Sequence, residues 1–424
     1  MTRLLLALAL AFAFATFAPS ARADQPPMRD WTILGWFCAD DEHDVGIEES
    51  QFQNMVDLAS VGTGPRMAVA VQFDRGQKTS PWLHDHEDEP DYRGAKRYLL
   101  EAGKPVPVEK LGEVNMGDPA TLLAFLEWAA QRYPARHYLV IFNSHGSGTL
   151  SWRGPGSVAD RRPGRVDLGT SHYVAYDDTN DDCLTIFEMA AALKRFNEKC
   201  NPGRKVDLVA FDSCMAETVE ALFELREAVD YLAGTESLMP GEGLNYRAVV
   251  RAIDHQPEIT PVALGEVIAH SFITRADPGN VYAVFGTEHA EELAAACSRL
   301  ARELYTEGRD NGKLSFRHRV PMENCNWDLE SIAHSALELR AAAVTPSMEA
   351  AVHKVLEVLA LSRTSFRRSG KLAQSPVGGL SIQWPTEKDY KEYRAFYKAT
   401  AFAKATLWDE FLDWQELGIA PSAK

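Results

Sequence analysis

Residues 205–218 read KVDLVAFDSCMAET, an apolar run that stops abruptly at Asp212, Ser213 and Cys214. An alanine- and glutamate-rich segment follows. A nearly continuous apolar run of this length predicts a strand covered on both faces of a sheet. The segment after it predicts a helix, so this stretch forms one strand-to-helix unit of an α/β fold.

The same alternation recurs along the chain. Apolar runs rich in β-branched or aromatic residues lie at 31–37, 67–73, 137–143, 206–211, 230–235 and 281–286. Segments with helical spacing lie at 121–133, 185–199, 216–228 and 287–305. Thr185 and Glu188 form a capping-box pattern at the start of the second helical segment. This alternation predicts an α/β domain with a mainly parallel central sheet.

Two of the predicted strands end in residues that can carry chemistry. HYLVIFNSHGSGT (137–149) ends its strand at His145, and the opening stretch ends its strand at Cys214. Chemistry in open parallel sheets gathers at the carboxyl ends of the strands. Each residue alone has a plain explanation, since a buried cysteine is usually an inert small hydrophobe and a histidine beside glycines can be a turn residue. On neighbouring parallel strands, however, the two side chains would emerge together at one edge.

These residue types suit nucleophilic catalysis. Cys214 stands at a predicted helix start, where unpaired amides and the helix dipole favour the thiolate, which is the strong nucleophile. Histidine titrates near neutral pH, so His145 can protonate a leaving amine. The backbone amides of Gly146 and Cys214 can donate hydrogen bonds to a developing oxyanion.

Length and composition set the class of protein. The chain has 424 residues, 46% hydrophobic and 25% charged, enough for one large domain or two modest ones. Its net charge of −16 argues against nucleic acid as a partner. Residues 1–23 have the pattern of a secretory signal peptide cut before Asp24, because Arg3 precedes an uncharged run and small residues close the segment. The alternative, a membrane anchor, needs a longer run of about 20 residues, so we expect export to the periplasm or medium without stable membrane insertion.

The residues resemble the clostripain-like cysteine peptidases, which share the caspase-type fold with caspases, gingipains and legumain. Similar blocks run in family order through nearly the whole chain after the signal peptide: DWTILGWFCADDE, LGEVNMGDPATLLAFLEWAAQRYPARHYLVIFNSHGSG, YDDTNDDCLTIFEMAAAL, DLVAFDSCMAETVEAL, GTESLMPGEGLNY, GLSIQWP and YKEYRAFYKATAFAKATLWDEFLDW. The resemblance implies a caspase-like three-layer sandwich, a dyad of His145 and Cys214, and cleavage of peptide or protein substrates after a basic residue. Two positions depart from the family pattern. Ser144 stands where an aspartate often precedes the histidine, and the aromatic Trp152 comes late after the glycines.

A preference for basic residues points to acidic side chains near the dyad. Asp212 lies two residues before Cys214, so its side chain leans toward the same side of an extended strand end. By the resemblance, such an aspartate receives the basic side chain of the substrate. The plain alternative is a solvated or helix-capping aspartate. Glu236 follows the next predicted strand and is a candidate second carboxylate, with Glu242 as its rival.

Residues 151–172 are rich in glycine, arginine and proline, which predicts a mobile surface loop. In an enzyme that prefers arginine, this loop is also a place for self-cleavage. Pro163 should protect the bond after Arg162, so the candidate cleavage sites are Arg153, Arg161 and Arg165.

Metal binding has weaker sequence support. Calcium is a candidate ion because the family includes calcium-responsive members and DDTNDDCLTIFEM is acidic. However, Cys183 and Met189 stand where an EF-hand loop that begins at Asp178 needs glycine and glutamate, so only a looser calcium site remains open. The six cysteines contain no CxxC pair, and disulfide pairing is left open.

We therefore expect an exported cysteine endopeptidase that cuts after arginine, with lysine second, and needs no organic cofactor. Residues 24–310 are expected to form the peptidase domain, and 311–424 an extension on the same body. In the extension, 326–363 reads as helical and GLSIQWP as a strand. The first alternative is a catalytically inactive binding or scaffold protein with the same fold, for which Ser144 is the best hint. The second is a metal-dependent hydrolase that uses His84 and His86, although these histidines more simply belong to a solvated loop.

Overall fold

The computed structural model describes residues 26–41, 45–78, 80–85, 89, 91–146, 173–275, 280–316, 318–322, 325–339 and 344–420. The predicted signal peptide lies outside these residues, as do the candidate cleavage sites Arg153, Arg161 and Arg165, the side chain of His84, and His86.

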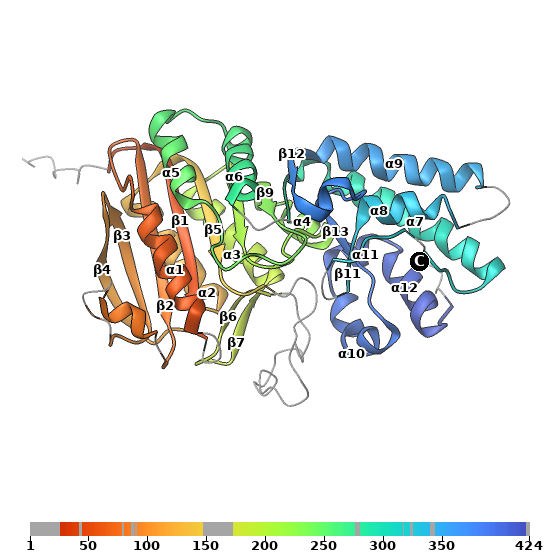
Figure 1. Cartoon of the computed structure of the whole chain (residues 1–424), viewed down its shortest axis with the longest axis horizontal. Helices are drawn as coiled ribbons and strands as arrows, with labels where there is room; N and C mark the ends of the chain where they lie inside the picture. Colours follow the sequence, from red (N-terminus) through yellow and green to blue (C-terminus); the bar gives the residue numbers. More distant parts are fainter. Residues whose placement is uncertain are drawn as a thin grey trace, which may run out of the picture.

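Nine strands form one mixed sheet in the order β12-β10-β9-β8-β5-β1-β2-β3-β4 (Figure 1). Its five central strands are parallel: β9 (Val229–Gly234), β8 (Val206–Asp212), β5 (Ala135–Asn143), β1 (Arg29–Ala39) and β2 (Met67–Arg75). Antiparallel strands complete both edges: β10 (Val281–Gly286) and β12 (Arg363–Arg368) on one side, β3 (Ala95–Glu101) and β4 (Lys104–Gly112) on the other. The expected mainly parallel sheet is confirmed.

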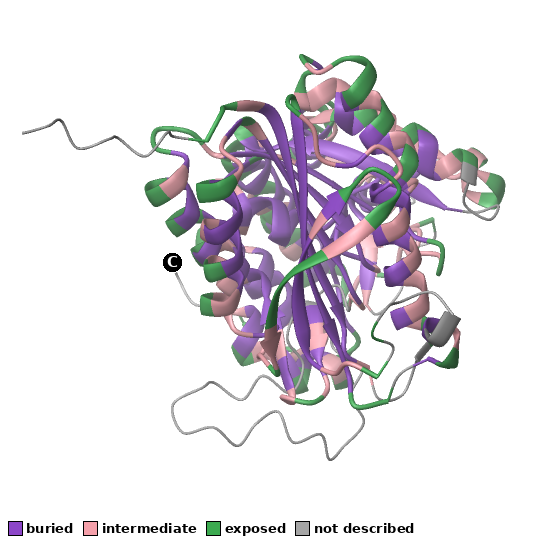
Figure 2. Cartoon of the chain, turned by 90° about the vertical axis from the view of Figure 1, so that its left-hand side faces the viewer, coloured by how far each residue is buried: buried purple, intermediate pink, exposed green. Residues whose placement is uncertain are grey.

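Burial explains why the central strands read as continuous apolar runs. All seven residues of β8 are buried, because helices cover both faces of the sheet (Figure 2). The edge strand β4 is mostly exposed and carries lysines and two prolines, Pro105 and Pro107, which suit an edge because proline cannot donate to a further strand.

Helices form a layer on each face of the sheet. One face packs against α1 (Val45–Leu58), α5 (Tyr246–His255) and α6 (Pro261–Arg275). The other packs against α2 (Pro119–Arg132), α3 (Ile186–Cys200) and α4 (Val219–Leu225). The predicted capping box is present at α3, where Thr185 accepts a hydrogen bond from the amide of Glu188 and the Glu188 carboxylate accepts one from the amide of Thr185. The result is a three-layer α/β sandwich.

The C-terminal part of the chain lies beside the end of the sheet at β12 (Figure 1, right). Its helices are α7 (Ala290–Asn311), α8 (Leu329–Ala336), α9 (Pro346–Ser362), α10 (Glu387–Tyr397), α11 (Ala401–Ala405) and α12 (Trp408–Leu417). The short strands β11 (Asn326–Asp328) and β13 (Ser381–Gln383) pair with each other. The shorter elements are η1 (Pro81–Asp85), η2 (Thr287–His289), η3 (Gly370–Gln374) and the hairpin of β6 (Tyr173–Asp177) and β7 (Asp182–Thr185).

One expectation for this region needs correction. Residues 326–363 are not helical throughout, because they begin with β11, and β12 starts at Arg363 and joins the main sheet. The strand expected in GLSIQWP is confirmed as β13, which pairs with β11. The aromatic series expected to pack helices does so, since Tyr390, Tyr393, Phe396, Tyr397, Phe402 and Trp408 are all buried.

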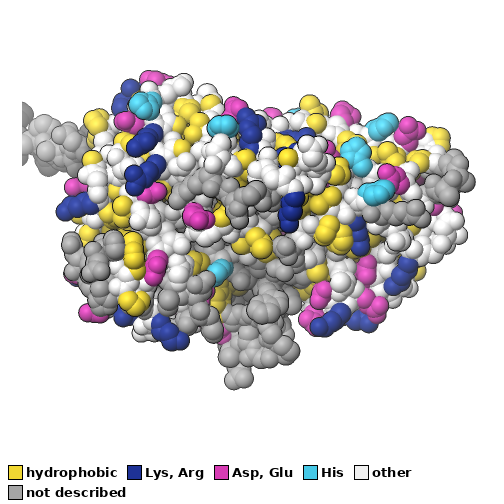
Figure 3. Space-filling view, viewed as in Figure 1, with side chains coloured by type: hydrophobic (Ala, Val, Ile, Leu, Met, Phe, Trp, Pro, Cys, Tyr) yellow, Lys and Arg dark blue, Asp and Glu magenta, His cyan; other side chains and the backbone are white. Residues whose placement is uncertain are grey.

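The surface is mixed in charge despite the acidic total. On the face shown in Figure 3, acidic and basic side chains are interspersed. Among the described residues, the helices are either too short or too polar for a membrane span.

Candidate active site

The register of two strands brings the predicted dyad to one edge. In the parallel pair β5–β8, Asn143 lies opposite Asp212. His145 and Cys214 each follow that pair by two residues, so both leave the sheet at its carboxyl edge. Gly146 lies directly against the Cys214 backbone, since a Cβ at position 146 would stand 2.3 Å from the Cys214 carbonyl oxygen and 2.9 Å from its amide nitrogen. The expectation that these strands are parallel neighbours is confirmed.

The local setting of Cys214 differs from the prediction. Helix α4 begins at Val219, with Thr218 as its N-cap, and Cys214 lies in a turn before it. The predicted effect of the helix dipole on the thiol is therefore wrong, because that effect fades within the first turn. Instead, the amide of Met239 donates a hydrogen bond to the half-buried Cys214 sulfur at 3.2 Å. This contact fixes the position of the sulfur beside the loop after β9.

The turn that carries Cys214 is held by the loop after β9. Met215 has a φ of 54°, a left-handed conformation that is unusual for a residue with a side chain. Its amide donates to the Ser237 carbonyl at 2.8 Å, and the amide of Glu217 donates to the Thr235 carbonyl at 3.2 Å. Strained residues of this kind cluster at functional sites, because surrounding contacts must hold them in place.

His145 has a carboxylate partner that the sequence analysis missed. Its Nε2 atom lies 2.7 Å from Oδ2 of Asp41, whose side chain is 14% exposed against 42% for the histidine. Asp41 follows β1, which pairs with β5 so that Phe37 lies opposite Asn143. The available signal was the pair Asp40 and Asp41, which follows the predicted strand at 31–37 after two intervening residues.

Asp212 is neither solvated nor a helix cap. It is only 4% exposed, and its Oδ2 atom accepts hydrogen bonds from Asn143 Nδ2 at 3.2 Å, the Leu244 amide at 3.1 Å and the Tyr246 hydroxyl at 2.5 Å. Burial and the nearby Asp212 carboxylate raise the pKa of Tyr246 well above its usual range, so its phenol stays protonated as a donor. Gly243 packs its α-carbon against this carboxylate.

The two candidate second carboxylates lie in different settings. Glu236 is fully buried, and its Oε1 atom accepts a hydrogen bond from the Gly379 amide at 3.1 Å. Burial, followed by the charge of Asp328, raises the pKa of Glu236 well above its usual range. Glu236 thus faces the C-terminal segment and not the solvent-exposed rim where it was expected. Glu242 is exposed and precedes Gly243, which touches Asp212.

Four carboxylates gather beside this edge and could hold a cation. They are Asp40, Asp74, Glu113 and Asp177, and each offers an oxygen within 4.8 Å of the others. We call these four residues the carboxylate cluster. Burial, with the neighbouring negative charges, raises the pKa of Asp177 to about 7 and that of Asp74 well above its usual range. Of the acidic segment that the sequence analysis considered for calcium, only Asp177 belongs to this cluster, and the other three members come from distant segments.

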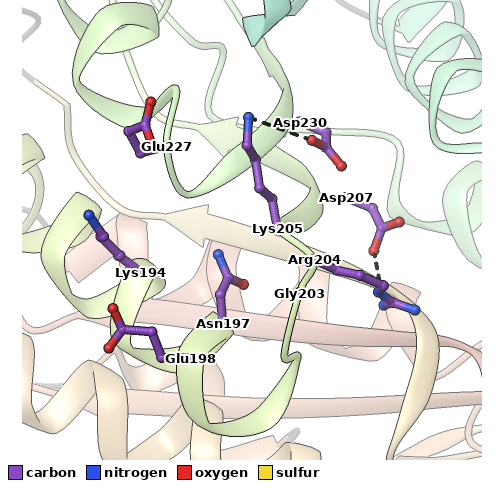
Figure 4. Close-up of a pocket in the computed structure, with 9 residues that line it drawn as sticks. All are labelled: Lys194, Asn197, Glu198, Gly203, Arg204, Lys205, Asp207, Glu227 and Asp230. Carbon is purple, nitrogen blue, oxygen red and sulfur yellow. Dashed lines mark ion pairs between the residues drawn. The ribbon is translucent and has the colours of Figure 1, made fainter.

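A separate hollow lies at the opposite edge of the sheet (Figure 4). It measures about 530 Å³ and is lined by Lys194, Asn197, Glu198, Gly203, Arg204, Lys205, Asp207, Glu227 and Asp230. Lys205 pairs with Asp230 and Arg204 with Asp207, each at 3.9 Å. Because these residues surround the amino ends of β8 and β9, the hollow is not part of the site at His145 and Cys214.

Comparison with known proteins decides the family. The model of the clostripain family matches residues 101–414, about three quarters of the chain. The chain belongs to the clostripain family of cysteine peptidases. The resemblance noted in the sequence is therefore confirmed.

Individual relatives are more distant. Clostripain from Hathewaya histolytica is 30% identical over 145 residues, which make up 32% of this chain and 24% of clostripain. The chain therefore matches only about a quarter of the length of that curated relative. An inactive zymogen C11 protease from Parabacteroides distasonis is 16% identical, with a TM-score of 0.60 over 90% of this chain and 99% of that one. A secreted C11 cysteine protease from Bacteroides thetaiotaomicron, solved with an irreversible peptide inhibitor, is 17% identical, with a TM-score of 0.62 over the same shares. These two structures confirm the caspase-like fold.

Proposed function

We propose that this clostripain-family protein is an exported cysteine endopeptidase that hydrolyses peptide bonds after arginine, with lysine as the second choice. The observation that supports the proposal is that His145 and Cys214 each follow the paired Asn143 and Asp212 by two residues at one sheet edge, with Gly146 against the Cys214 backbone. Family membership supplies the reaction class. The substrates are peptides or proteins with basic residues.

The residues take distinct roles in this reaction. The Cys214 sulfur attacks the substrate carbonyl, and the amides of Gly146 and Cys214 donate to the developing oxyanion. His145 protonates the leaving amine, which departs and leaves a thioester. Water then attacks the thioester with His145 as base, and the acid product leaves as the thiol is restored. Asp41 orients the imidazole and stabilises its protonated form, because its carboxylate contacts Nε2.

Specificity is assigned to two carboxylates near the dyad, the buried Asp212 and the exposed Glu242. Three hydrogen bonds to Oδ2 hold Asp212 in one place, so its negative charge is presented in a fixed position. Glu242 is exposed on the loop between β9 and α5, directly before Gly243, and adds a second negative charge for a guanidinium. Glu236 is left out of this proposed substrate site because it is buried against the C-terminal segment.

A catalytically inactive scaffold is the alternative that Ser144 suggested. Ser144 is 6% exposed, and its Oγ atom makes no hydrogen bond. The carboxylate that serves the histidine comes instead from Asp41, on a neighbouring strand end. This replacement favours the enzyme over the scaffold.

Export and self-processing complete the proposal. The leader pattern of residues 1–23 supports export, and one structural relative is described as secreted. Another is described as an inactive zymogen, which fits activation by internal cleavage after Arg153, Arg161 or Arg165. Wild-type protein that stays one chain on a denaturing gel while it is active would remove the self-processing step.

The test compares residues 24–424 with the same protein carrying Cys214→Ala. Both are offered arginyl, lysyl and aspartyl fluorogenic peptides, with calcium and with chelator. Arginyl cleavage that disappears in the variant supports the peptidase. A folded protein that is silent on every peptide favours the scaffold, and activity that depends on metal but survives Cys214→Ala favours a metal-dependent hydrolase.

A further inference from the structure

Residues 235–239 follow β9, and three of their backbone groups contact the turn at 214–217. We call residues 235–239 the support loop. Two of its carbonyls accept hydrogen bonds from amides of the turn, at 2.8 and 3.2 Å. The amide of Met239 donates to the sulfur of Cys214 at 3.2 Å. Because Met215 in this turn has the unusual φ of 54°, the turn needs such contacts to keep its shape, and the support loop therefore fixes where the sulfur lies.

One side chain from a distant part of the chain holds the support loop. Asn280 directly precedes β10 and is 8% exposed. Its Nδ2 atom donates a hydrogen bond to the carbonyl of Leu238 at 2.9 Å. Its Oδ1 atom accepts hydrogen bonds from the hydroxyls of Ser237 at 2.8 Å and Thr235 at 3.2 Å. The Asn280 side chain thus bonds three successive turns of contact in the support loop, on Thr235, Ser237 and Leu238.

Asn280 is itself anchored to the sheet. Its Oδ1 atom also accepts a hydrogen bond from the amide of Val281, the first residue of β10, at 2.8 Å. Its carbonyl accepts one from the amide of Ser369, directly after β12, at 2.9 Å. A buried side-chain amide that is bonded at both its oxygen and its nitrogen has one favourable orientation. Asn280 therefore ties the support loop to the antiparallel edge of the main sheet.

The carboxamide group suits this place better than a carboxylate would. The support loop offers a carbonyl, which needs a donor, and hydroxyl groups, which can donate to an acceptor. A carboxamide supplies a donor and an acceptor at once. An aspartate at position 280 would have no proton for the carbonyl of Leu238 and would bury a charge beside it.

We propose that Asn280 is a positioning residue for Cys214. It acts through the support loop, because its side chain bonds that loop and the loop bonds the turn of the nucleophile. Attack on a carbonyl depends on the place of the sulfur, and a displacement of about 1 Å can cost about 100-fold in rate. The inference rests on the proposed function, in which Cys214 is the nucleophile.

The test compares residues 24–424 with the variants Asn280→Ala and Asn197→Ala. Asn197 is the matched control, because it is 7% exposed and its Nδ2 atom donates to the carbonyl of Ala228 at 2.8 Å, at the opposite edge of the sheet. Each variant removes a buried side-chain amide and leaves a main-chain carbonyl without its donor. Both should therefore lower the melting temperature, by about 2–6 °C.

Only Asn280→Ala should change the reaction. Its kcat on an arginyl peptide should fall at least about 30-fold, while KM changes by less than about threefold, because the lost contact affects the chemical step and not binding. Asn197→Ala should keep kcat within about twofold of the parent. If the two folded variants have the same kcat, Asn280 has a structural role only and the proposal is overturned.

Hydrogen exchange provides a readout that needs no activity. In Asn280→Ala, the amides of residues 214–217 and of the support loop should exchange at least about tenfold faster than in the parent. Asn197→Ala should leave their exchange unchanged. Unchanged exchange in Asn280→Ala overturns the proposal. If the parent cleaves no peptide but Asn280→Ala shows the faster exchange, the proposed function is wrong while the hold of Asn280 on the Cys214 turn is supported.

Ser237→Ala is a milder variant for the case that Asn280→Ala does not fold. It removes one hydroxyl that donates to Oδ1 of Asn280. Its kcat should fall about threefold or more with KM unchanged. The double variant should be no slower than Asn280→Ala, because both substitutions break the same contact. A Ser237→Ala variant with full kcat, or losses that multiply in the double variant, would count against the proposal.

Discussion

Nε2 of His145 lies 2.7 Å from Oδ2 of Asp41, although the two residues are 104 positions apart in the sequence. The contact is possible because β1 and β5 are parallel neighbours whose carboxyl ends meet at one edge. Asp41 is therefore a third residue of the proposed site, and it contacts the imidazole of the histidine.

Replacing Asp41 should impair the chemistry and not the fold. Asp41→Asn keeps the size of the side chain but removes the charge that stabilises the protonated imidazole. We expect kcat on an arginyl peptide to fall about 10- to 100-fold, while KM changes by less than about threefold. The melting temperature should stay within about 2 °C of wild type. Asp41→Glu should restore part of the rate, and a loss that appears mainly in KM would contradict the positioning role.

Gly146 should tolerate no side chain. A Cβ there would overlap the Cys214 carbonyl oxygen and crowd its amide, so the two segments would have to separate. We expect Gly146→Ala to lower kcat/KM at least about 100-fold, because small displacements at a catalytic pair are costly. Gly241→Ala is the control, since no atom lies within 4 Å of its added Cβ. If Gly146→Ala and Gly241→Ala are equally active, the proposed oxyanion role of Gly146 is wrong.

Much of this architecture could be predicted from the sequence, because the central strands are covered on both faces. That burial leaves continuous apolar runs such as VDLVAF, and the first polar residues after them mark the carboxyl edge. His145 and Cys214 were found in this way, from local pattern alone. The resemblance to the clostripain family then supplied the reaction.

The features that escaped prediction depend on contacts between distant segments. Helical spacing suggested a helix from residue 216, yet residues 214–217 form a turn because the loop after β9 binds the amides of Met215 and Glu217. Strand β12, at the edge of the sheet, has the sequence RTSFRR. Its arginines break the apolar pattern from which the other strands were predicted. The contact of Asp41 with His145 and the carboxylate cluster likewise depend on segments that lie far apart in the sequence, so no local sequence pattern predicts them.

The buried pair of Glu236 and Asp328 should make stability depend on pH. Burial raises the pKa of Asp328 from its usual 3.8 to about 7. Between these values the folded protein keeps a proton that the unfolded chain has lost, so stability falls as pH rises from about 4 to about 7. Glu236→Gln removes one of the two charges, and its amide can donate to Asp328. We expect it to melt about 2–4 °C above wild type at about pH 8, with the difference shrinking toward pH 4.5.

The exposed Glu242 supplies the control for that experiment. Glu242→Gln should leave the melting temperature unchanged at both pH values. Glu236→Gln should also retain arginyl cleavage, because the Glu236 side chain is inside the protein. If Glu236→Gln keeps its fold but loses arginyl cleavage, Glu236 belongs to the substrate site after all.

Asp212 is expected to select the basic residue of the substrate, and its contacts allow that role to be separated from its structural one. Asp212→Asn should lower kcat/KM on arginyl peptides at least about 100-fold, because a guanidinium would lose its charged partner. Alkylation of Cys214 by iodoacetamide, which has no basic group, should stay within about threefold of wild type. Tyr246→Phe is the matched control, since it removes one donor to Asp212 and keeps the charge. Both variants should lose about 1–3 kcal/mol of unfolding free energy, because each leaves a buried polar group without its partner. If Tyr246→Phe loses arginyl cleavage as strongly as Asp212→Asn, or if Asp212→Asn keeps it, Asp212 supports the loop at Gly243 and does not read the substrate.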